Sequence, residues 1–274
     1  MSAPDLLSLV LTLRPLAAPP DRPLPVWWGQ AAHAALLRVV QQADPDLSAR
    51  LHEDDGLKPF TASSLMGRPA PGRTSRLRFS AATAELSALL LQAAQAGPLA
   101  PGARLELDYI PFEITATTWR ADEHPWAGTA SYADLTAGGL LGGAPPRRIT
   151  LQFASPTGFR SGGMHQPLPL PELVFGSLLE RWNRFAPAAF PEEARRYAGE
   201  CLAISRFELR SRSAPLKGSG LRVGAVGTVA YAALNGDRFW LSVMHTLAAF
   251  ALYAGVGAGA GLGFGQCRLL PGGE

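Results

Sequence analysis

The chain has 274 residues, of which 47% are hydrophobic and 17% charged, with 29 glycines and 24 prolines. This composition provides ample material for a buried core, and it favours many turns and long loops over a helical bundle. The net charge is only +3, but residues 1–146 carry −3 and residues 147–222 carry +6. The basic second region indicates a polyanionic partner, which leaves RNA, DNA and a membrane surface open.

The two cysteines, Cys201 and Cys267, have no CxxC spacing, so neither a disulfide framework nor a zinc site is indicated, which suits a reducing cytoplasm. No basic segment precedes the first apolar run, so no signal peptide is expected. A transmembrane span is the alternative for residues 239–267, which contain no acidic or basic side chain apart from histidine. Its alternating glycines disfavour a helix, and we expect no membrane span.

The first half of the chain predicts the element order β-α-β-β-α-β. The expected elements are a strand at 6–16, a helix at 28–43, a further turn at 47–52, strands at 58–65 and 76–79, a helix at 83–96 and a strand at 104–119. Proline-rich or glycine-rich turns are expected at 15–25, 53–56 and 69–72. This order is that of the split βαβ, or ferredoxin-like, unit.

The order recurs in the second half. The expected elements are a strand at 148–154, helices at 171–185 and 191–200, paired strands at 202–212 and 221–234, a helix at 238–253 and a strand at 266–270. We therefore predict an α+β fold of two tandem ferredoxin-like domains, 1–125 and 147–274. A connector at 126–146, with short helical potential at 132–140, is expected between them.

A glycine-rich stretch lies between the last helix and the last strand, with glycine at every odd position from Gly255 to Gly265. Successive backbone amides in such a stretch can bind a phosphate. The alternatives are a flexible loop or a segment pressed against another backbone. A dinucleotide fingerprint and an NTPase phosphate loop are both excluded, because the spacing does not fit and the stretch contains no lysine.

The paired strands carry a concentration of arginine. Arg206, Glu208, Arg210 and Arg212 alternate along one face of the first strand, and Lys217 and Arg222 lie in or just after the turn. This pattern is typical of a surface that contacts a sugar–phosphate backbone, and a solvated edge strand protected by charge is the alternative. The segment 159–163, FRSGG, could stack a base and hold a phosphate through Arg160, or form an ordinary loop.

None of the five histidines has metal-ligand spacing, so neither a metal nor another cofactor is expected. His33 borders the apolar stripe of the first helix, where packing is the alternative to catalysis. His52 precedes Glu53 and two aspartates, in what we expect to be a loop. His124 and His165 are also expected in loops, and His245 in a structural position on the last helix.

Four stretches, in the same chain order, resemble the CRISPR-associated endoribonucleases that process precursor CRISPR RNA, which are members of the RAMP superfamily. They are LHEDDGLKPFTASSL at 51–65, GFRSGG at 158–163, PLPELVFGSLLERW at 169–182, and FALYAG at 250–255 continuing through the glycines to Arg268. The resemblance implies two ferredoxin-like domains and metal-independent cleavage within the CRISPR repeat. In that reaction the 2′-hydroxyl attacks the adjacent phosphate and leaves 2′,3′-cyclic phosphate (or 3′-phosphate) and 5′-hydroxyl ends.

The resemblance assigns the catalytic histidine to His33, with His52 in reserve and Lys58 as a source of charge stabilisation. The predicted RNA-binding residues are Arg160, Arg206, Arg210, Arg212, Lys217, Arg222, Gly255, Gly257, Gly263 and Gly265. Many relatives carry a basic residue within the glycine loop, whereas this chain has none at 256–264. Any grip on RNA by this loop therefore depends on main-chain amides.

The implied partner is precursor CRISPR RNA in a prokaryotic cytoplasm. Other subunits of a CRISPR effector complex and a homodimer are left open as partners. A non-catalytic RNA-binding subunit with the same fold is the alternative function.

Overall fold

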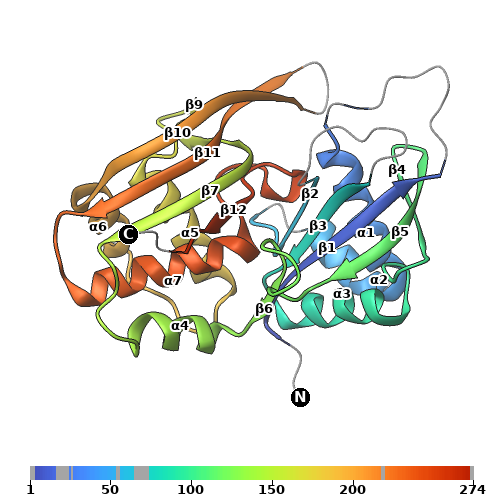
Figure 1. Ribbon diagram of the computed structural model, residues 1–274, viewed down its shortest axis with the longest axis horizontal. Helices are drawn as coiled ribbons and strands as arrows, with labels where there is room; N and C mark the ends of the chain where they lie inside the picture. Colours follow the sequence, from blue (N-terminus) through green and yellow to red (C-terminus); the bar gives the residue numbers. More distant parts are fainter. Residues whose placement is uncertain are drawn as a thin grey trace. The chain divides into compact units, whose positions relative to one another are not determined.

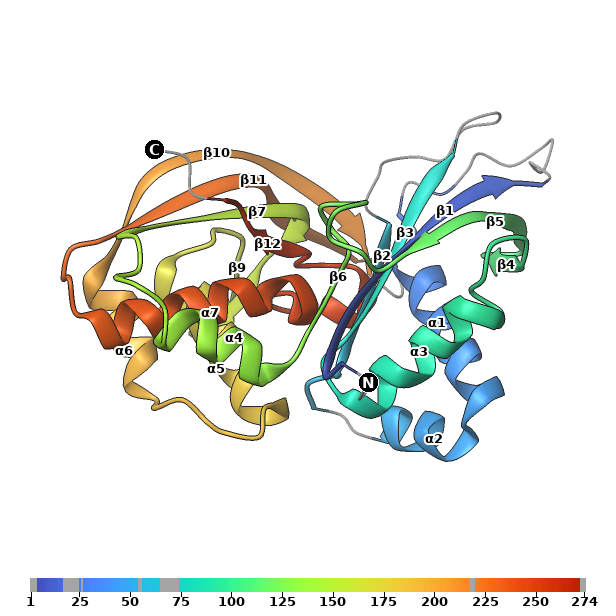
Figure 2. The ribbon, with the colours of Figure 1, turned by 60° about the horizontal axis from the view of Figure 1, so that its bottom comes forward.

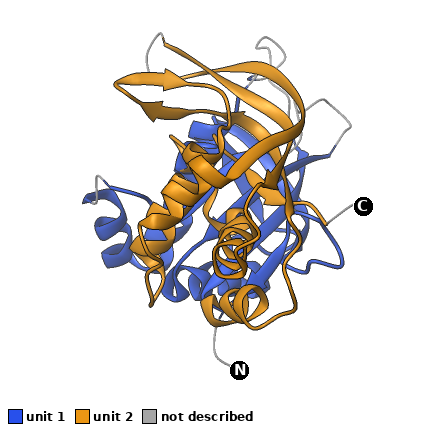
Figure 3. Ribbon diagram, turned by 90° about the vertical axis from the view of Figure 1, so that its left-hand side faces the viewer, with its two compact units in different colours: residues 1–130, 261–263 blue, residues 131–260, 264–274 orange. Residues whose placement is uncertain are grey.

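The computed structural model describes residues 4–16, 25, 27–53, 56–64, 74–216 and 220–271. The chain forms two compact units (Figure 3). Unit 1 comprises Met1–Ala130 together with Gly261–Gly263, and unit 2 comprises Ser131–Ala260 together with Phe264–Glu274. Three residues of the glycine-rich stretch, Gly261–Gly263, therefore belong to unit 1, although they are far in sequence from the rest of that unit.

Unit 1 contains a sheet in the order β2-β3-β1-β5-β4, with β6 also paired to β1 (Figure 1). Its elements are β1 (Leu6–Pro15), α1 (Gly29–Ala43), α2 (Pro45–Glu53), β2 (Phe60–Ser64), β3 (Ser75–Ala81), α3 (Ala84–Ala96), β4 (Arg104–Leu107), β5 (Ile110–Thr118) and β6 (Gly128–Ala130). All of its strand pairs are antiparallel.

Alternate leucines of β1, from Leu7 to Leu13, are at most 1% exposed and pack with Phe79 of β3 in the core of unit 1. Leu36 and Val40 of α1 and Leu90 of α3 belong to the same core and are fully buried. Because successive strand residues point to opposite faces, the helices cover the leucine face of this sheet (Figure 2).

Unit 2 contains a sheet in the order β10-β11-β7-β12 and a separate β8-β9 hairpin. Its elements are α4 (Tyr132–Leu140), β7 (Arg148–Thr157), β8 (Phe159–Ser161), β9 (Met164–Gln166), α5 (Pro171–Phe185), α6 (Glu193–Cys201), β10 (Leu202–Pro215), β11 (Leu221–Ala233), α7 (Arg238–Ala254), the short 3₁₀ helix η1 (Ala260–Leu262) and β12 (Cys267–Leu269). All pairs in the larger sheet are antiparallel.

Each unit has its second, third, first and fourth main strands side by side in that order, which is the arrangement of the split βαβ unit. The predicted tandem ferredoxin-like fold is therefore confirmed. Of the predicted connector 126–146, β6 belongs to unit 1 and α4 to unit 2. The domain boundaries at 125 and 147 remain a prediction.

The predicted single strand at 104–119 is wrong, because Asp108 and Tyr109, at φ 49° and 64°, form a tight turn between β4 and β5. The predicted turn at 47–52 is helix α2, so the loop position predicted for His52 is also wrong. Asp44 Oδ1 accepts the N–H of Leu47 at 2.8 Å, and Pro45 occupies the first turn of the helix.

Residues 159–163, for which an ordinary loop was one alternative, belong to the β8-β9 hairpin. The loop position predicted for His165 is wrong, because this residue belongs to β9. Gly162 and Gly163, at φ 57° and 77°, supply the turn of the hairpin. The predicted turn at 69–72 and most of the loop at 15–25 lie outside the described residues. Among the helices described, none is long and apolar enough to cross a membrane.

Candidate active site and nucleic-acid interface

His33 projects from α1 at the border of that helix's buried face. Ala32, Leu36 and Val40 of α1 are fully buried, whereas the imidazole of His33 is only half-buried. Its ring centroid lies 5.5 Å from that of Phe60, the first residue of β2. The residue therefore packs against the core of unit 1 on one side and keeps access to solvent on the other.

The Nδ1 atom of His33 lies 2.9 Å from the main-chain oxygen of Gly261. A carbonyl oxygen can only accept, so Nδ1 carries the hydrogen and donates it. In the neutral imidazole this leaves Nε2 as the acceptor. A residue 228 positions later in the chain thus fixes the tautomer and the orientation of His33.

Only glycine fits where the segment Gly261–Gly263 packs against the start of α1. A Cβ atom added at Gly29 would lie 1.9 Å from the carbonyl oxygen of Leu262. Gly263 has φ +89°, and a Cβ there would lie 3.0 Å from the Cα of Gly29. The close approach of these two backbones places the Gly261 carbonyl beside His33.

Lys58 and His52 lie near the same histidine. Lys58 Nζ donates to the carbonyl oxygen of Leu51 at 2.6 Å and so ties the last turn of α2 to the segment before β2. A Cβ on Gly261 would lie 3.8 Å from both His33 Nδ1 and the Cβ of Lys58. Unit 1 therefore brings together all three residues that the resemblance assigned to catalysis.

Burial lowers the pKa of His33, because desolvation disfavours the charged imidazolium. The hydrogen bond to Gly261 opposes this shift, while the positive charges of Lys58 and His52 lower the pKa further. The net direction is downwards from 6.5, so the ring is neutral at pH 7. A neutral, oriented imidazole with a free Nε2 can accept a proton.

No cluster of three or more histidine, cysteine or acidic residues that could hold a metal occurs among the described residues. Three of the other histidines there, His124, His165 and His245, have hydrogen bonds to main-chain atoms. His165 Nε2 donates to Val223 O at 2.5 Å, His245 Nε2 donates to Pro146 O at 2.8 Å, and His124 Nδ1 accepts from Trp126 N at 3.1 Å.

The glycine-rich stretch is packed tightly in unit 2 as well. The N–H groups of Gly255, Gly257 and Gly265 donate to Ala251 O, Ser177 Oγ and Pro156 O respectively. A Cβ on Gly265 would lie 1.8 Å from the carbonyl oxygen of Val256. The predicted amide grip on a phosphate therefore does not apply to the N–H groups of these three glycines. Close backbone packing explains the absence of a side chain at Gly257 and Gly265, and a positive φ of 64° explains it at Gly255.

Two arginines from neighbouring elements hold this stretch in place. Arg181 of α5, only 4% exposed, donates to Gly257 O at 3.1 Å, and burial lowers its pKa to about 10. Arg222 donates to Ala258 O at 3.1 Å, and its guanidinium lies 4.8 Å from the centroid of the Phe264 ring. These contacts supply basic groups at a loop that has none of its own.

Arg222 is also close to the exposed Arg160 of the β8-β9 hairpin. Burial lowers the pKa of Arg222, and the positive charge of Arg160 lowers it further. Within the part of the chain that the structure describes, no ion pair is formed by either guanidinium. Two neighbouring cations of this kind can bind a phosphate.

The predicted cationic strand is β10, an edge strand of unit 2. Arg206, Arg210 and Arg212 are exposed and lie opposite Ala230, Val226 and Gly224 of β11, so they share one face. Lys217 lies outside the described residues.

Sequence reasoning missed several residues that shape these sites, namely Gly29, Phe60, Arg181 and Phe264. Gly29 carried a usable signal, because glycine at the start of an amphipathic helix is unfavourable unless another backbone approaches closely. Arg181 also carried a usable signal, because it is a basic residue at a position that falls among the buried residues of α5. The residues that Gly29 and Arg181 contact in the glycine-rich stretch, Leu262 and Gly257, carried no comparable signal in the sequence.

The family profile described as "CRISPR-associated endoribonuclease Cas6" matches residues 151–267, which is less than half of the chain. A curated relative with the same description, from Mycobacterium tuberculosis, is 29% identical over 127 residues. That alignment covers 46% of this chain and 40% of the relative. The match therefore spans well under half the length of this relative.

Solved structures match the fold over nearly the whole chain. The product complex of Cas6 (TTHB231), a protein of Thermus thermophilus, has a TM-score of 0.81 and 26% identity, covering 98% of this chain and 100% of that one. The product complex of Cas6 (TTHA0078) has a TM-score of 0.77 and 29% identity, covering 97% and 99%. The chain is thus similar to Cas6 proteins throughout, and the resemblance to the CRISPR-associated endoribonucleases that process precursor CRISPR RNA is confirmed.

Proposed function

We propose that this protein is an endoribonuclease that cleaves CRISPR repeat RNA and so generates mature CRISPR RNA. The observation that carries the proposal is the orientation of a neutral His33 by the Gly261 carbonyl, beside Lys58 and His52. The similarity to Cas6 proteins solved with an RNA-processing product or a substrate mimic supports the choice of substrate.

In the proposed reaction, Nε2 of His33 accepts the proton of the 2′-hydroxyl at the cleavage site. The 2′-oxygen then attacks the adjacent phosphorus in line, and the bond from phosphorus to the 5′-oxygen breaks. The products are a 2′,3′-cyclic phosphate and, once the leaving oxygen has been protonated, a 5′-hydroxyl. Because the nucleophile belongs to the RNA and side chains carry the protons, we propose cleavage without a metal ion.

Two side chains beside His33 suit the other two requirements of this chemistry, which are stabilisation of the charge on the phosphorane and protonation of the leaving oxygen. Lys58, fixed by its hydrogen bond to Leu51 O, would stabilise the negative charge that develops on the phosphorane oxygens. His52, exposed at the end of α2, is the candidate for protonating the 5′-oxygen.

Unit 2 would bind the RNA. Its exposed arginines on β10 and the pair formed by Arg160 and Arg222 suit contacts to the sugar–phosphate backbone. The glycine-rich stretch would serve these contacts indirectly, because the carbonyl oxygens of Gly257 and Ala258 accept hydrogen bonds from Arg181 and Arg222.

The test is cleavage of labelled repeat RNA by the full chain in excess EDTA. We expect cutting at one position, abolished by a single 2′-deoxy substitution at the scissile nucleotide. A control RNA has the same substitution one nucleotide away and should be cut normally. Cleavage that requires a divalent metal, or that leaves a 5′-phosphate, would contradict the mechanism. Tight binding without any cleavage would favour the alternative, a non-catalytic RNA-binding subunit.

A further inference from the structure

The sheet of unit 2 has one face covered by helices and one open face. Leu151, Phe153, Val229 and Tyr231 point to the covered face and are at most 1% exposed. In Figure 2, α5 and α7 lie on that side, and within the described residues of unit 2 no helix lies on the other. The side chains on the open face are therefore accessible to a ligand.

The open face is strongly basic. Strand pairing places on it Thr150 and Gln152 of β7, Thr228 and Ala230 of β11, and the arginines of β10, since paired residues point to the same side. Its charged residues are Arg148, Arg206, Arg210, Arg212 and Arg268, with Glu208 as the acidic side chain among them. Arg268 Nε donates to Gln152 Oε1 at 2.7 Å and is thereby held flat against the sheet.

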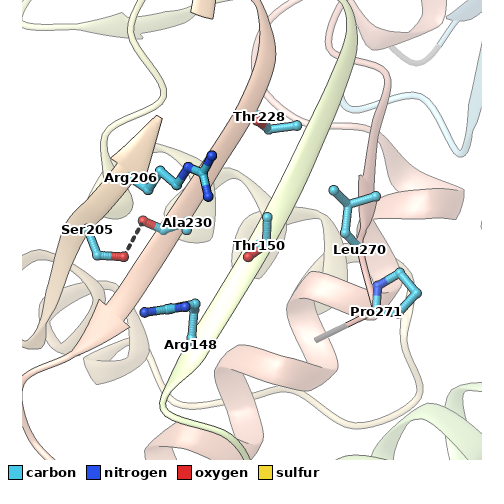
Figure 4. Close-up of a pocket in the computed structure, with 8 residues that line it drawn as sticks. All are labelled: Arg148, Thr150, Ser205, Arg206, Thr228, Ala230, Leu270 and Pro271. Atoms are coloured by element: carbon cyan, nitrogen blue, oxygen red, sulfur yellow. Dashed lines mark hydrogen bonds between the residues drawn. The ribbon is translucent and has the colours of Figure 1, made fainter. Parts of the chain in front are cut away.

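A depression of about 520 Å³ lies between the first two of these arginines. It is lined by Arg148, Thr150, Ser205, Arg206, Thr228, Ala230, Leu270 and Pro271. Figure 4 shows Arg206 reaching from β10 and Arg148 from β7, over the intervening β11 from its two sides. The small side chain of Ala230 lies between them and leaves the space open.

Both guanidiniums keep their hydrogen-bonding capacity for a ligand. Throughout the described chain, the guanidinium of neither Arg148 nor Arg206 forms an ion pair or a hydrogen bond, and both residues are exposed. The backbone is locally adapted as well. The β10–β11 register shifts between Ile204 and Arg206, so Ser205 lies at a bulge, where its Oγ donates to Ala230 O at 3.2 Å.

We propose that this depression, the Arg148–Arg206 pocket, binds the backbone of single-stranded RNA, with a phosphate between the two guanidiniums. The proposal rests on the proposed function, because it adds a binding site for the same RNA. Two arginines that line one depression without an acidic partner are suited to a phosphodiester, to which each can donate two hydrogen bonds. The hydroxyls of Thr150 and Thr228 are placed to meet the ribose, and Leu270 and Pro271 form an apolar wall.

The pocket contains no aromatic side chain and none of the amide side chains that read base edges. It therefore suits the backbone and not a particular base, so its contribution is independent of RNA sequence and falls with salt. A single strand can turn a sugar–phosphate unit into such a depression. A duplex carries its phosphates on a stiff outer surface and would meet only the rim.

The test measures binding of a labelled uridine octamer to the full chain by fluorescence anisotropy. The variant is the double substitution Arg148→Gln and Arg206→Gln. The matched control, Arg147→Gln and Arg196→Gln, removes two exposed arginines of unit 2 that do not line the pocket. We expect the pocket variant to raise the Kd about tenfold or more and the control to raise it less than threefold. A blunt RNA duplex should bind both variants equally.

The salt dependence provides a second readout, since the slope of log K against log salt should fall by about 0.7 for each lost phosphate contact. Equal Kd values for the pocket variant and the control would overturn the proposal, as would a larger loss for the duplex than for the octamer. These outcomes are separate from the proposed function, which fails only if the unaltered protein does not cleave repeat RNA.

Discussion

The two units have the same strand order but carry their functional groups in different places. In unit 1, His33, His52 and Lys58 gather where α1, the end of α2 and the start of β2 meet the segment Gly261–Gly263. In unit 2, the arginines lie along an edge strand and over the open face of the sheet. The shared topology therefore does not determine where a functional site lies. The site depends on the few side chains that each unit carries on that topology.

From this difference we expect unit 1 to perform the chemistry and unit 2 to provide the affinity for RNA. Substitutions in unit 1 should then lower the cleavage rate at saturating protein and leave the Kd for RNA nearly unchanged. Substitutions in unit 2 should do the reverse.

The largest effect is expected for His33→Ala. Loss of a general base reduces the rate by about 10²- to 10⁴-fold, and the Kd should change less than threefold because His33 makes no contribution to the basic surface of unit 2. Single-turnover cleavage of repeat RNA measures the rate, and a filter-binding titration measures the Kd. The control is His124→Ala, another histidine of unit 1, which should cleave normally.

A somewhat smaller loss of rate, about 100-fold, is expected for Gly29→Ala. Its Cβ would lie 1.9 Å from Leu262 O and would displace the segment that carries the Gly261 carbonyl, and misplacement by about 1 Å is sufficient for such a loss. Gly138→Ala in α4, where a Cβ meets nothing within 4 Å, is the matched control. Circular dichroism separates misfolding from misorientation. Full activity of a folded Gly29→Ala variant would contradict the claim that the segment Gly261–Gly263 orients His33.

The pH dependence of the rate should show the lowered pKa of His33. Because burial depresses this pKa below 6.5, the neutral base predominates at pH 7, and the acid limb of the rate profile should lie below pH 6.5. Lys58→Met removes a charge that lowers the pKa of His33, so the acid limb should move to higher pH. Rates measured from pH 5 to 8 at constant ionic strength provide the check, and a limb that moves to lower pH would contradict it.

The smallest effects are expected on β10. Arg210→Gln or Arg212→Gln should each raise the Kd by roughly 3- to 10-fold and reduce the salt slope by about 0.7 to 0.9, with no change in the saturated rate. Glu208→Gln, on the same face, serves as the control and should bind RNA slightly more tightly. A loss of saturated rate in the arginine variants would show that unit 2 takes part in the chemistry.

Much of the fold could be predicted from the sequence because hydrophobic periodicity records which face of each element is buried. The helices at 83–96 and 238–253 and the order of the main strands follow from such patterns. The division of 104–119 into two strands could not be predicted from such patterns, since Asp108 and Tyr109 adopt positive φ angles without the glycine that usually signals a tight hairpin turn.

The candidate site could be predicted only as separate residues. The resemblance selected His33, His52 and Lys58, but nothing local in the sequence indicates that Gly261, 228 positions away, accepts a hydrogen bond from the first of them. The glycine-rich stretch was expected to grip a phosphate through its amides. Instead three of its glycines, Gly257, Gly263 and Gly265, permit close backbone contacts, which depend on tertiary packing that no local pattern records.

The most direct test of the central claim, that the loop holds a neutral His33 with Nε2 free, is a nitrogen NMR titration of ¹⁵N-histidine-labelled protein. We expect the His33 ring at pH 7 to be the neutral tautomer with hydrogen on Nδ1, and to become protonated only below pH 6.5. The His33→Ala spectrum assigns the signals. A ring with hydrogen on Nε2 alone, or one that is charged at pH 7, would contradict the account.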